Sequence, residues 1–236
     1  MIFKIAPLLG VILLLSQCNH PVSDNHLPAP DPVIQRSGYI LSYDGKTRNA
    51  NWVYQELTPA SLEGEASRDR CDFMQDPLIP ASLRTTQEDY RGSGFDKGHL
   101  CPAADAKSSP QAMKETFYLS NVSPQHPLLN RKTWLKLEKY VRALAKSSDV
   151  VYVITGPLFL PHTKKDGKRY VKYQVIGKND VAVPTHFFKV LQAKKGGNFQ
   201  REAYIIPNQP QPQDYPLSHF AVTLDRVEQA AGIVFK

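Results

Sequence analysis

The sequence predicts one α+β domain of about 200 residues, starting near residue 38. Two observations carry this prediction. Several short segments rich in aromatic and β-branched residues are typical of strands, and the first two flank an Asp44-Gly45 turn. One longer segment carries apolar residues at helical spacing. No internal repeat is present, so the chain is expected to build one core.

The first two strands are expected at residues 39–43 and 51–56, joined as a β-hairpin. Residues 117–122 read as a short buried strand that Pro124 and Pro127 end, with Phe117 and Leu119 on one face. The remaining elements are strands at 150–155, 170–176, 186–191 and 203–206, a loop at 207–216, and a terminal helix at 224–231.

The longer helix is expected from Asn130, as its N-cap, to about residue 146. Its apolar stripe is formed by Trp134, Leu137, Val141 and Leu144. At about 100° per residue, Asn130 and Glu138 each lie about 40° from Trp134, so both border the buried stripe. The residues alone leave two readings open: a functional pair, or a plain cap together with an i,i+4 ion pair from Glu138 to Arg142.

The segment RGSGFDKGHL at residues 91–100 concentrates chemistry in a short stretch. His99 can accept a proton near neutral pH, because the unperturbed imidazole pKa is about 6.5. Gly98 allows unusual backbone angles and close approach of a substrate. Asp96 could orient the ring, and Lys97 could contact a phosphate. A surface loop with an incidental histidine is the alternative.

The motif Asp96-Lys97-Gly98-His99 resembles the Asp-Arg-Gly-His signature of the DNA/RNA non-specific endonucleases, the ββα-metal nucleases. The resemblance covers roughly residues 38–235. It continues in TFYLSN (116–121), Asn130, Leu137-Glu138, TGPLFL (155–160), YVKYQVIGK (170–178) and VPTHFFKV (183–190). It implies a central, mainly antiparallel sheet with helices on both faces.

The resemblance implies that His99 is the general base that activates water. It implies that Asn130 binds Mg²⁺ directly and that Glu138 holds one of the waters of that ion, with Mn²⁺ able to substitute. It also implies hydrolysis of phosphodiester bonds in DNA and RNA, leaving 5′-phosphate and 3′-hydroxyl ends. The alternative is a non-catalytic lipoprotein that binds nucleic acid at a cell surface.

The family further implies an arginine about thirty residues before the base that stabilises phosphate charge. Arg68 is the first candidate, and Arg70 is the reserve. Asn121 is expected near the site and is counted with the catalytic residues. The signature arginine is Lys97 here, which keeps the charge but loses the two-pronged phosphate contact. The candidate substrate contacts are Lys97, Arg70, Arg131 and Arg142.

Charge agrees with a polyanionic substrate, since the net charge is +7. The basic runs at 164–169 and at Lys194-Lys195 are candidate phosphate contacts, although such runs more often mark solvated loops. The spacing of Cys and His residues does not indicate a structural zinc site. Cys71 and Cys101 could pair in an oxidising compartment, and a homodimer is left open.

The N-terminus predicts a targeting segment. Residues 1–17 resemble a secretory signal, because Lys4 precedes a largely apolar stretch at 5–15 that is too short to span a membrane. Cys18 follows as in a bacterial lipobox, although Gln17 is a poor match, and residues 18–37 form a Pro-containing tether. A periplasmic or outer-membrane lipoprotein of a bacterium is expected, with the mitochondrial intermembrane space as the alternative.

Overall fold

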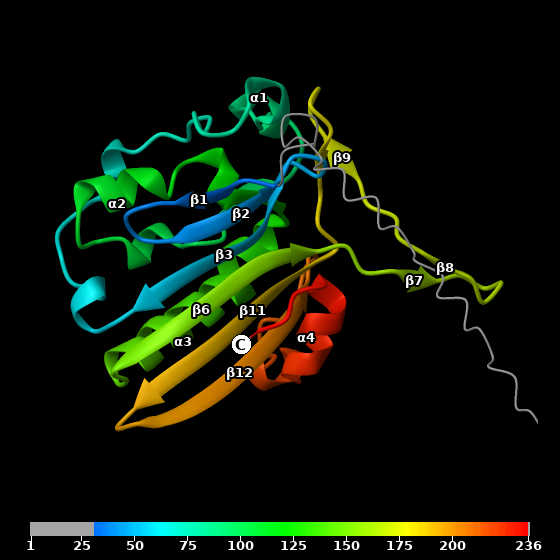
Figure 1. Cartoon of the computed structure of the whole chain (residues 1–236). Helices are drawn as coiled ribbons and strands as arrows, with labels where there is room; N and C mark the ends of the chain where they lie inside the picture. Colours follow the sequence, from blue (N-terminus) through cyan, green and yellow to red (C-terminus); the bar gives the residue numbers. More distant parts are fainter. Residues whose placement is uncertain (1–30, 236) are drawn as a thin grey trace, which may run out of the picture. The chain divides into compact units, whose positions relative to one another are not determined.

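The central feature of the computed structural model, which describes residues 31–235, is a seven-stranded sheet with strand order β1-β2-β3-β6-β11-β12-β13 (Figure 1). All of its neighbouring strands run antiparallel. Its strands are β1 (Val33–Gln35), β2 (Ile40–Asp44), β3 (Asn49–Leu57), β6 (Val150–Leu158), β11 (His186–Lys195), β12 (Asn198–Pro207) and β13 (Ala221–Val222).

Three two-stranded ribbons and four α-helices accompany this sheet in the described part, together with short 3₁₀ and π-helical turns. The ribbons pair β4 (Asp96–His99) with β5 (Val122–Gln125), β7 (His162–Thr163) with β8 (Arg169–Tyr170), and β9 (Val175–Ile176) with β10 (Val181–Ala182). The helices are α1 (Gln87–Tyr90), α2 (Pro110–Glu115), α3 (Leu135–Lys146) and α4 (Leu224–Ala231).

The predicted hairpin is confirmed as β2 and β3. The carboxylate of Asp44 closes the turn, because it accepts hydrogen bonds from the Lys46 backbone at 2.8 Å and the Thr47 hydroxyl at 2.6 Å. The sheet begins earlier than residue 38, since Val33–Gln35 pair with β2. This part of the predicted tether is therefore a strand, whereas residues 1–30, with the predicted signal and Cys18, lie outside the described residues.

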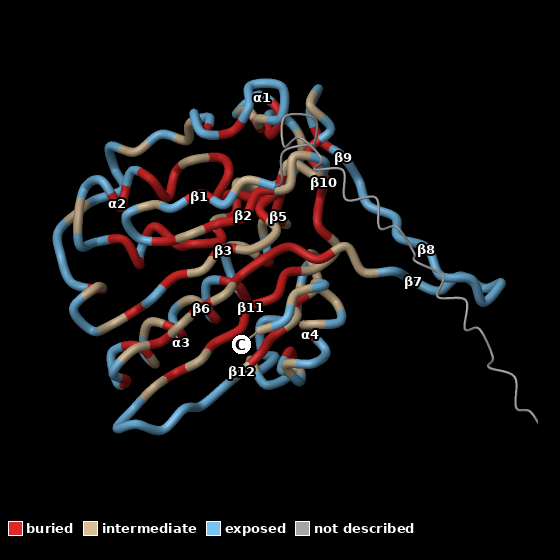
Figure 2. The backbone as a smooth tube through the Cα atoms, in the orientation of Figure 1, coloured by how far each residue is buried: buried red, intermediate tan, exposed pale blue. Residues whose placement is uncertain are grey.

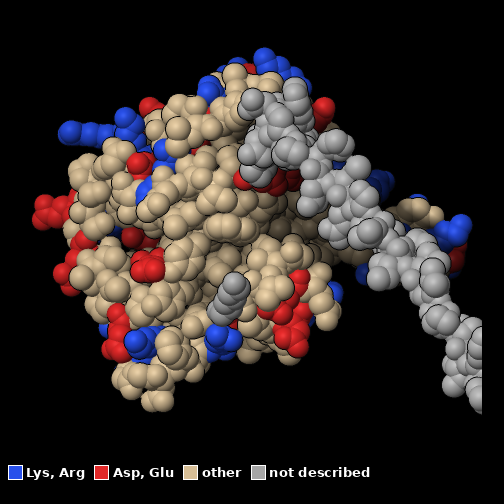
Figure 3. Space-filling view, in the orientation of Figure 1, with Lys and Arg blue, Asp and Glu red and all other residues tan. Residues whose placement is uncertain are grey.

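Residues 161–175, which we call the arm, are all exposed and protrude from the sheet at the right of Figures 1 and 2. Lys and Arg atoms lie along it in Figure 3. The strand predicted over 170–176 is wrong in its middle, because residues 171–174 pair with no strand and only Arg169–Tyr170 and Val175–Ile176 are strands. Its aromatic and β-branched residues cover no core here.

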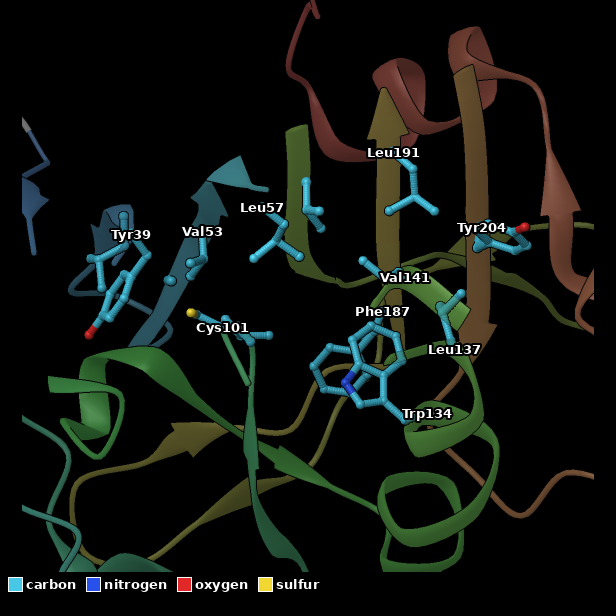
Figure 4. Packing of buried hydrophobic residues seen from close by; sticks show 14 of the residues in the cluster. Tyr39, Val53, Leu57, Cys101, Trp134, Leu137, Val141, Phe187, Leu191 and Tyr204 are labelled. Carbon is cyan, nitrogen blue, oxygen red and sulfur yellow. The ribbon is translucent and has the colours of Figure 1, made fainter. Parts of the chain in front are cut away.

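Alternation along β11 sends its side chains to two separate cores. Phe187 and Leu191 pack with Leu137 of α3 and with Trp134 directly before this helix, and both of these residues are fully buried (Figure 4). Phe188 and Val190 pack with Val227 of α4 on the opposite side of the sheet. Burial of each large apolar side chain contributes roughly 1.5–3 kcal/mol. Helices on both faces of a mainly antiparallel sheet are thus confirmed.

The strand predicted from residue 117 is wrong in its start. Leu119–Asn121 form a 3₁₀ turn, and the strand begins at Val122. The Asn121 side chain causes this, because it donates to the Thr116 carbonyl at 2.9 Å and closes the loop. Pro124 lies inside β5 instead of ending it, which a ribbon of two strands tolerates.

Candidate active site

The entry to α3 differs from the predicted N-cap. The backbone N–H of Asn130 donates to the His126 carbonyl at 2.9 Å, so the chain is already turning before this residue. Leu129–Trp134 form a π-helical turn that runs directly into α3. Such turns are frequent at functional sites. Asn130 is therefore not a cap, and its side chain is free to take another partner.

That partner is Asp96 at the start of β4. Its carboxylate accepts hydrogen bonds from Asn130 Nδ2 at 2.9 Å and from Arg131 Nε and Nη2 at 2.8 and 2.6 Å. Burial alone would raise the pKa of Asp96, but these hydrogen bonds lower it below its usual value. An ionised carboxylate only accepts, so the Asn130 nitrogen must face it. The amide oxygen, Oδ1, accepts no hydrogen bond from the described residues.

His99 ends β4 and is held by aromatic rings. Its ring centroid lies 5.2 Å from that of Phe73 and 5.1 Å from that of Phe117. Nε2 is buried and has no hydrogen-bond partner among residues 31–235. Burial and then the charge of Arg68 lower the pKa of His99 to about 3. The imidazole is therefore neutral near pH 7, as a proton acceptor must be.

Gly98 is needed for close packing in the β4–β5 ribbon, and not for an unusual backbone conformation. A Cβ at this position would lie 2.3 Å from Gln125 Oε1 and 2.6 Å from Gln125 Cβ, which is too close for any side chain. Gly98 is directly opposite Ser123 in the β4–β5 pairing and lacks a positive φ. The glycine thus permits the close pairing that places His99, and the interpretation based on unusual backbone angles is wrong.

A buried charge network lies beneath Glu138. Arg142 Nη1 donates to Asp105 Oδ1 at 2.9 Å, so the ion pair between Glu138 and Arg142, which was one of the two readings left open, does not form. Burial raises the pKa of Glu138, and the cation of Lys189 opposes this shift. The sequence reading missed Asp105 and Lys189. A lysine at an inward position of the apolar segment 187–191 was the available signal.

Seven of the predicted residues meet in a single cleft of about 450 Å³. Its walls include Arg68, Lys97, His99, Asn130, Arg131, Glu138 and Arg142. Arg131 and Arg142 are paired with aspartates, whereas Arg68 and Lys97 form no ion pair with any described residue. The cleft therefore combines a neutral imidazole, a free amide oxygen, a carboxylate and two uncompensated cations.

Two predicted residues do not line the cleft. Asn121 is 0% exposed. Its side-chain amide accepts a hydrogen bond from the Cys101 N–H and donates one to the Cys101 carbonyl, each at 2.9 Å. It holds the backbone just after His99, so its contacts are those of a positioning residue. Arg70 is exposed on the 3₁₀ turn Arg68–Arg70 and lies outside the cleft. Cys71 and Cys101 are both free thiols.

Residues 20–236 match the family model of the DNA/RNA non-specific endonucleases. The chain belongs to this family. It is 52% identical to the mitochondrial endonuclease G of Bos taurus over 210 residues, which cover 89% of this chain and 70% of the bovine protein. It is 45% identical to nuclease C1 of Cunninghamella echinulata, covering 91% and 88% of the two chains. The protein is therefore a nuclease that hydrolyses phosphodiester bonds.

A solved structure agrees with the fold. The crystal structure of the EndoG–EndoGI complex, described as showing the mechanism of EndoG inhibition, matches with a TM-score of 0.85 and 45% identity. The match covers 89% of this chain and 87% of that one. The expectation of a ββα-metal nuclease fold is confirmed.

Proposed function

We propose that this endonuclease cleaves DNA and RNA with Mg²⁺, leaving 5′-phosphate and 3′-hydroxyl ends, with His99 as the general base. The observation that carries the proposal is the joint lining of one cleft by His99, Asn130 and Glu138. Binding alone would require cations but no neutral base beside an oxygen ligand. Membership of an endonuclease family argues against the non-catalytic binding lipoprotein.

The donor set fits a hydrated magnesium ion. The described residues contain no group of three or more His, Cys, Asp or Glu side chains placed to hold a metal. Mg²⁺ keeps several waters and needs few protein oxygens. Asn130 Oδ1 would bind it directly, Glu138 would bind it through water, and Mn²⁺ would substitute. When bound, the ion would neutralise charge on the phosphate and assist the leaving oxygen.

The protein's own residues supply the remaining chemistry. Neutral His99 takes a proton from the attacking water. Arg68 lines the cleft as a fixed cation and stabilises negative charge that grows on the phosphate. Lys97, whose Nζ lies 5.4 Å from the Phe73 ring centroid, contributes a point charge. Arg68 and Lys97 would contact phosphates, which DNA and RNA both carry and which hold no sequence information, so cleavage of both polymers without sequence selection is expected.

Parallel digestion of plasmid DNA and single-stranded RNA tests this proposal. We expect both to be degraded, with products that a 5′-phosphate-dependent exonuclease accepts without prior kinase treatment. Products that need a kinase first would contradict the end chemistry. Activity on only one of the two polymers would contradict the absence of sugar selection.

Replacing Asp96 with asparagine should raise the Mg²⁺ concentration for half-maximal activity by about 10-fold, because partners that orient a metal ligand typically contribute 10- to 100-fold. The substitution keeps the size of the side chain but loses the carboxylate that fixes the Asn130 amide. A Mg²⁺ titration of initial rates checks this. The control is Lys132→Gln, at an exposed residue of the π-helical turn that also holds Asn130. An unchanged titration would show that Asp96 does not orient the ligand.

The location of the protein remains a proposal. Within residues 31–235 no helix has the length and apolarity needed to cross a bilayer. The relatives named mitochondrial agree with the mitochondrial alternative and give no support to a bacterial lipoprotein. Membrane association and a homodimer likewise stay predictions.

Mass spectrometry of the protein from its native host tests the N-terminus. We expect a mature chain without residues 1–17, because a positively charged start precedes a short apolar segment. A lipid on Cys18 would support the lipoprotein, and an unmodified start would support release into a compartment. Retention of Met1 would contradict removal of the segment.

A further inference from the structure

The arm carries a large share of the positive charge of the chain. Residues 161–175 contain five Lys and Arg residues against one Asp, a net charge of +4 compared with +7 for the whole protein. All fifteen positions are exposed. No ion pair within the described residues involves any of the five cations. Their charge is therefore available to a partner.

The backbone of the arm gives these cations a defined arrangement. Lys164 N–H donates to the Lys168 carbonyl at 2.9 Å, and Gly167 N–H donates to the Lys164 carbonyl at 3.0 Å. Gly167 supplies the positive φ of 78° that this tight turn requires. The turn closes the β7–β8 ribbon, so the lysines project from one compact tip. A flexible linker would not present charges in this way.

The same segment exposes aromatic side chains beside the cations. Tyr170 and Tyr173 are 37% and 39% exposed, and Lys164 Nζ lies 4.3 Å from the Tyr170 ring centroid. Aromatic rings next to cations suit nucleic acid, because bases stack on the rings while cations contact phosphates. A two-stranded ribbon also has the width that the major groove of a duplex admits.

The root of the arm is packed against the wall of the cleft. Ile176 and Val181, which follow the arm in β9 and β10, lie in one hydrophobic cluster with Tyr90. Phe73 and Phe95 pack against the same cluster. Tyr90, Phe73 and Phe95 also line the catalytic cleft. A polymer bound in the cleft would therefore lie against the same wall of residues that supports the arm.

We propose that the arm is a second nucleic-acid contact outside the catalytic cleft, which binds the phosphate backbone of the same polymer. This inference rests on the endonuclease activity but on none of the catalytic roles proposed above. A second copy of the chain is the less favoured occupant, because a partner of charge +7 would meet an arm of charge +4. A polyanion, in contrast, is attracted both by the arm and by the rest of the protein.

The test compares the triple variant Lys164→Gln, Lys165→Gln, Lys168→Gln with wild type on plasmid DNA and on a short oligonucleotide. We expect the ratio of kcat/KM on plasmid to kcat/KM on the oligonucleotide to fall about 5- to 10-fold, and the plot of log(kcat/KM) against log salt to become shallower by about 2–3, since each lost phosphate contact removes about 0.9.

The matched control is the triple variant Lys114→Gln, Lys139→Gln, Lys146→Gln, which removes the same charge from exposed positions of α2 and α3 outside the cleft. An equal fall in this control would show that net charge alone matters and would overturn the proposal. So would an unchanged ratio in the arm variant, or a changed sedimentation mass with an unchanged salt slope, which would make the arm a contact between copies. Wild type inactive on both substrates would instead contradict the proposed function.

Discussion

Replacing His99 with alanine should reduce kcat at least ~100-fold, because it removes the general base. The histidine is held by Phe73 and Phe117, and burial and Arg68 keep it neutral by lowering its pKa to about 3. An anionic phosphate in the cleft would offset the effect of Arg68 and strengthen the base. Initial rates on plasmid DNA with saturating Mg²⁺ measure the change.

Binding and folding controls separate the loss of the base from other effects of this substitution. DNA affinity measured without metal should stay near wild type, since the phosphate contacts come from Lys and Arg. His219→Ala, an exposed histidine outside the cleft, should leave the rate unchanged. Near-normal cleavage by the His99→Ala variant would remove His99 from the mechanism.

The stability of the same variant has a predicted pH dependence. The pKa of His99 is about 3 in the folded state and 6.5 in the unfolded state. Between pH 3 and pH 6.5 the unfolded chain therefore binds a proton at His99 that the folded protein does not bind. The contribution of neutral His99 to the free energy of unfolding is complete above pH 6.5 and is lost as the pH falls toward 3. The free energy of unfolding should therefore fall more steeply with acid in wild type than in His99→Ala.

Replacing Asn130 with alanine should raise the Mg²⁺ requirement by at least ~10-fold, because it removes the only direct protein ligand proposed. The amide nitrogen is already committed to Asp96 at 2.9 Å, so the change removes one oriented oxygen. Glu138→Gln should act in the same direction more weakly, since that contact is through water. Metal titrations of both variants measure this, and higher Mg²⁺ should restore part of the activity.

Lys132→Gln again provides the comparison, as an exposed residue in the same π-helical turn. If Asn130→Ala and Glu138→Gln both keep the wild-type titration, neither side chain holds the ion. Lost activity that no Mg²⁺ concentration restores, together with a lower melting temperature, would point to a role of Asn130 in folding.

Elements whose burial pattern depends only on residues close to one another in the sequence could be predicted. The hairpin at Asp44 and the Trp134 stripe follow from turn chemistry and helical spacing, and the terminal helix predicted at 224–231 is α4. The strand predicted over 170–176 is wrong at residues 171–174, because β-branched and aromatic residues indicate a strand whether or not a neighbouring strand is there to pair with it.

The candidate site was predictable in its residue types but not in its pairings. Asp96 clamps Asn130 across 34 positions, and Arg142 chooses Asp105 across 37 positions instead of its helical neighbour Glu138. Such partners depend on how β4 and the 3₁₀ turn Ala103–Asp105 that follows it meet the helical segment from Leu129 to Lys146, which no local pattern specifies. Lys189 had a local signal, as a lysine at an inward position of an apolar strand, but its neighbours in the network come from other elements.

Removal and restoration of metal tests the central claim most directly. Supercoiled plasmid incubated with the protein and Mg²⁺ should be nicked and then degraded. Excess EDTA should stop cleavage, and added Mg²⁺ beyond the EDTA should restore it in wild type but far less in Asn130→Ala. Undiminished cleavage in EDTA would contradict a metal-dependent endonuclease.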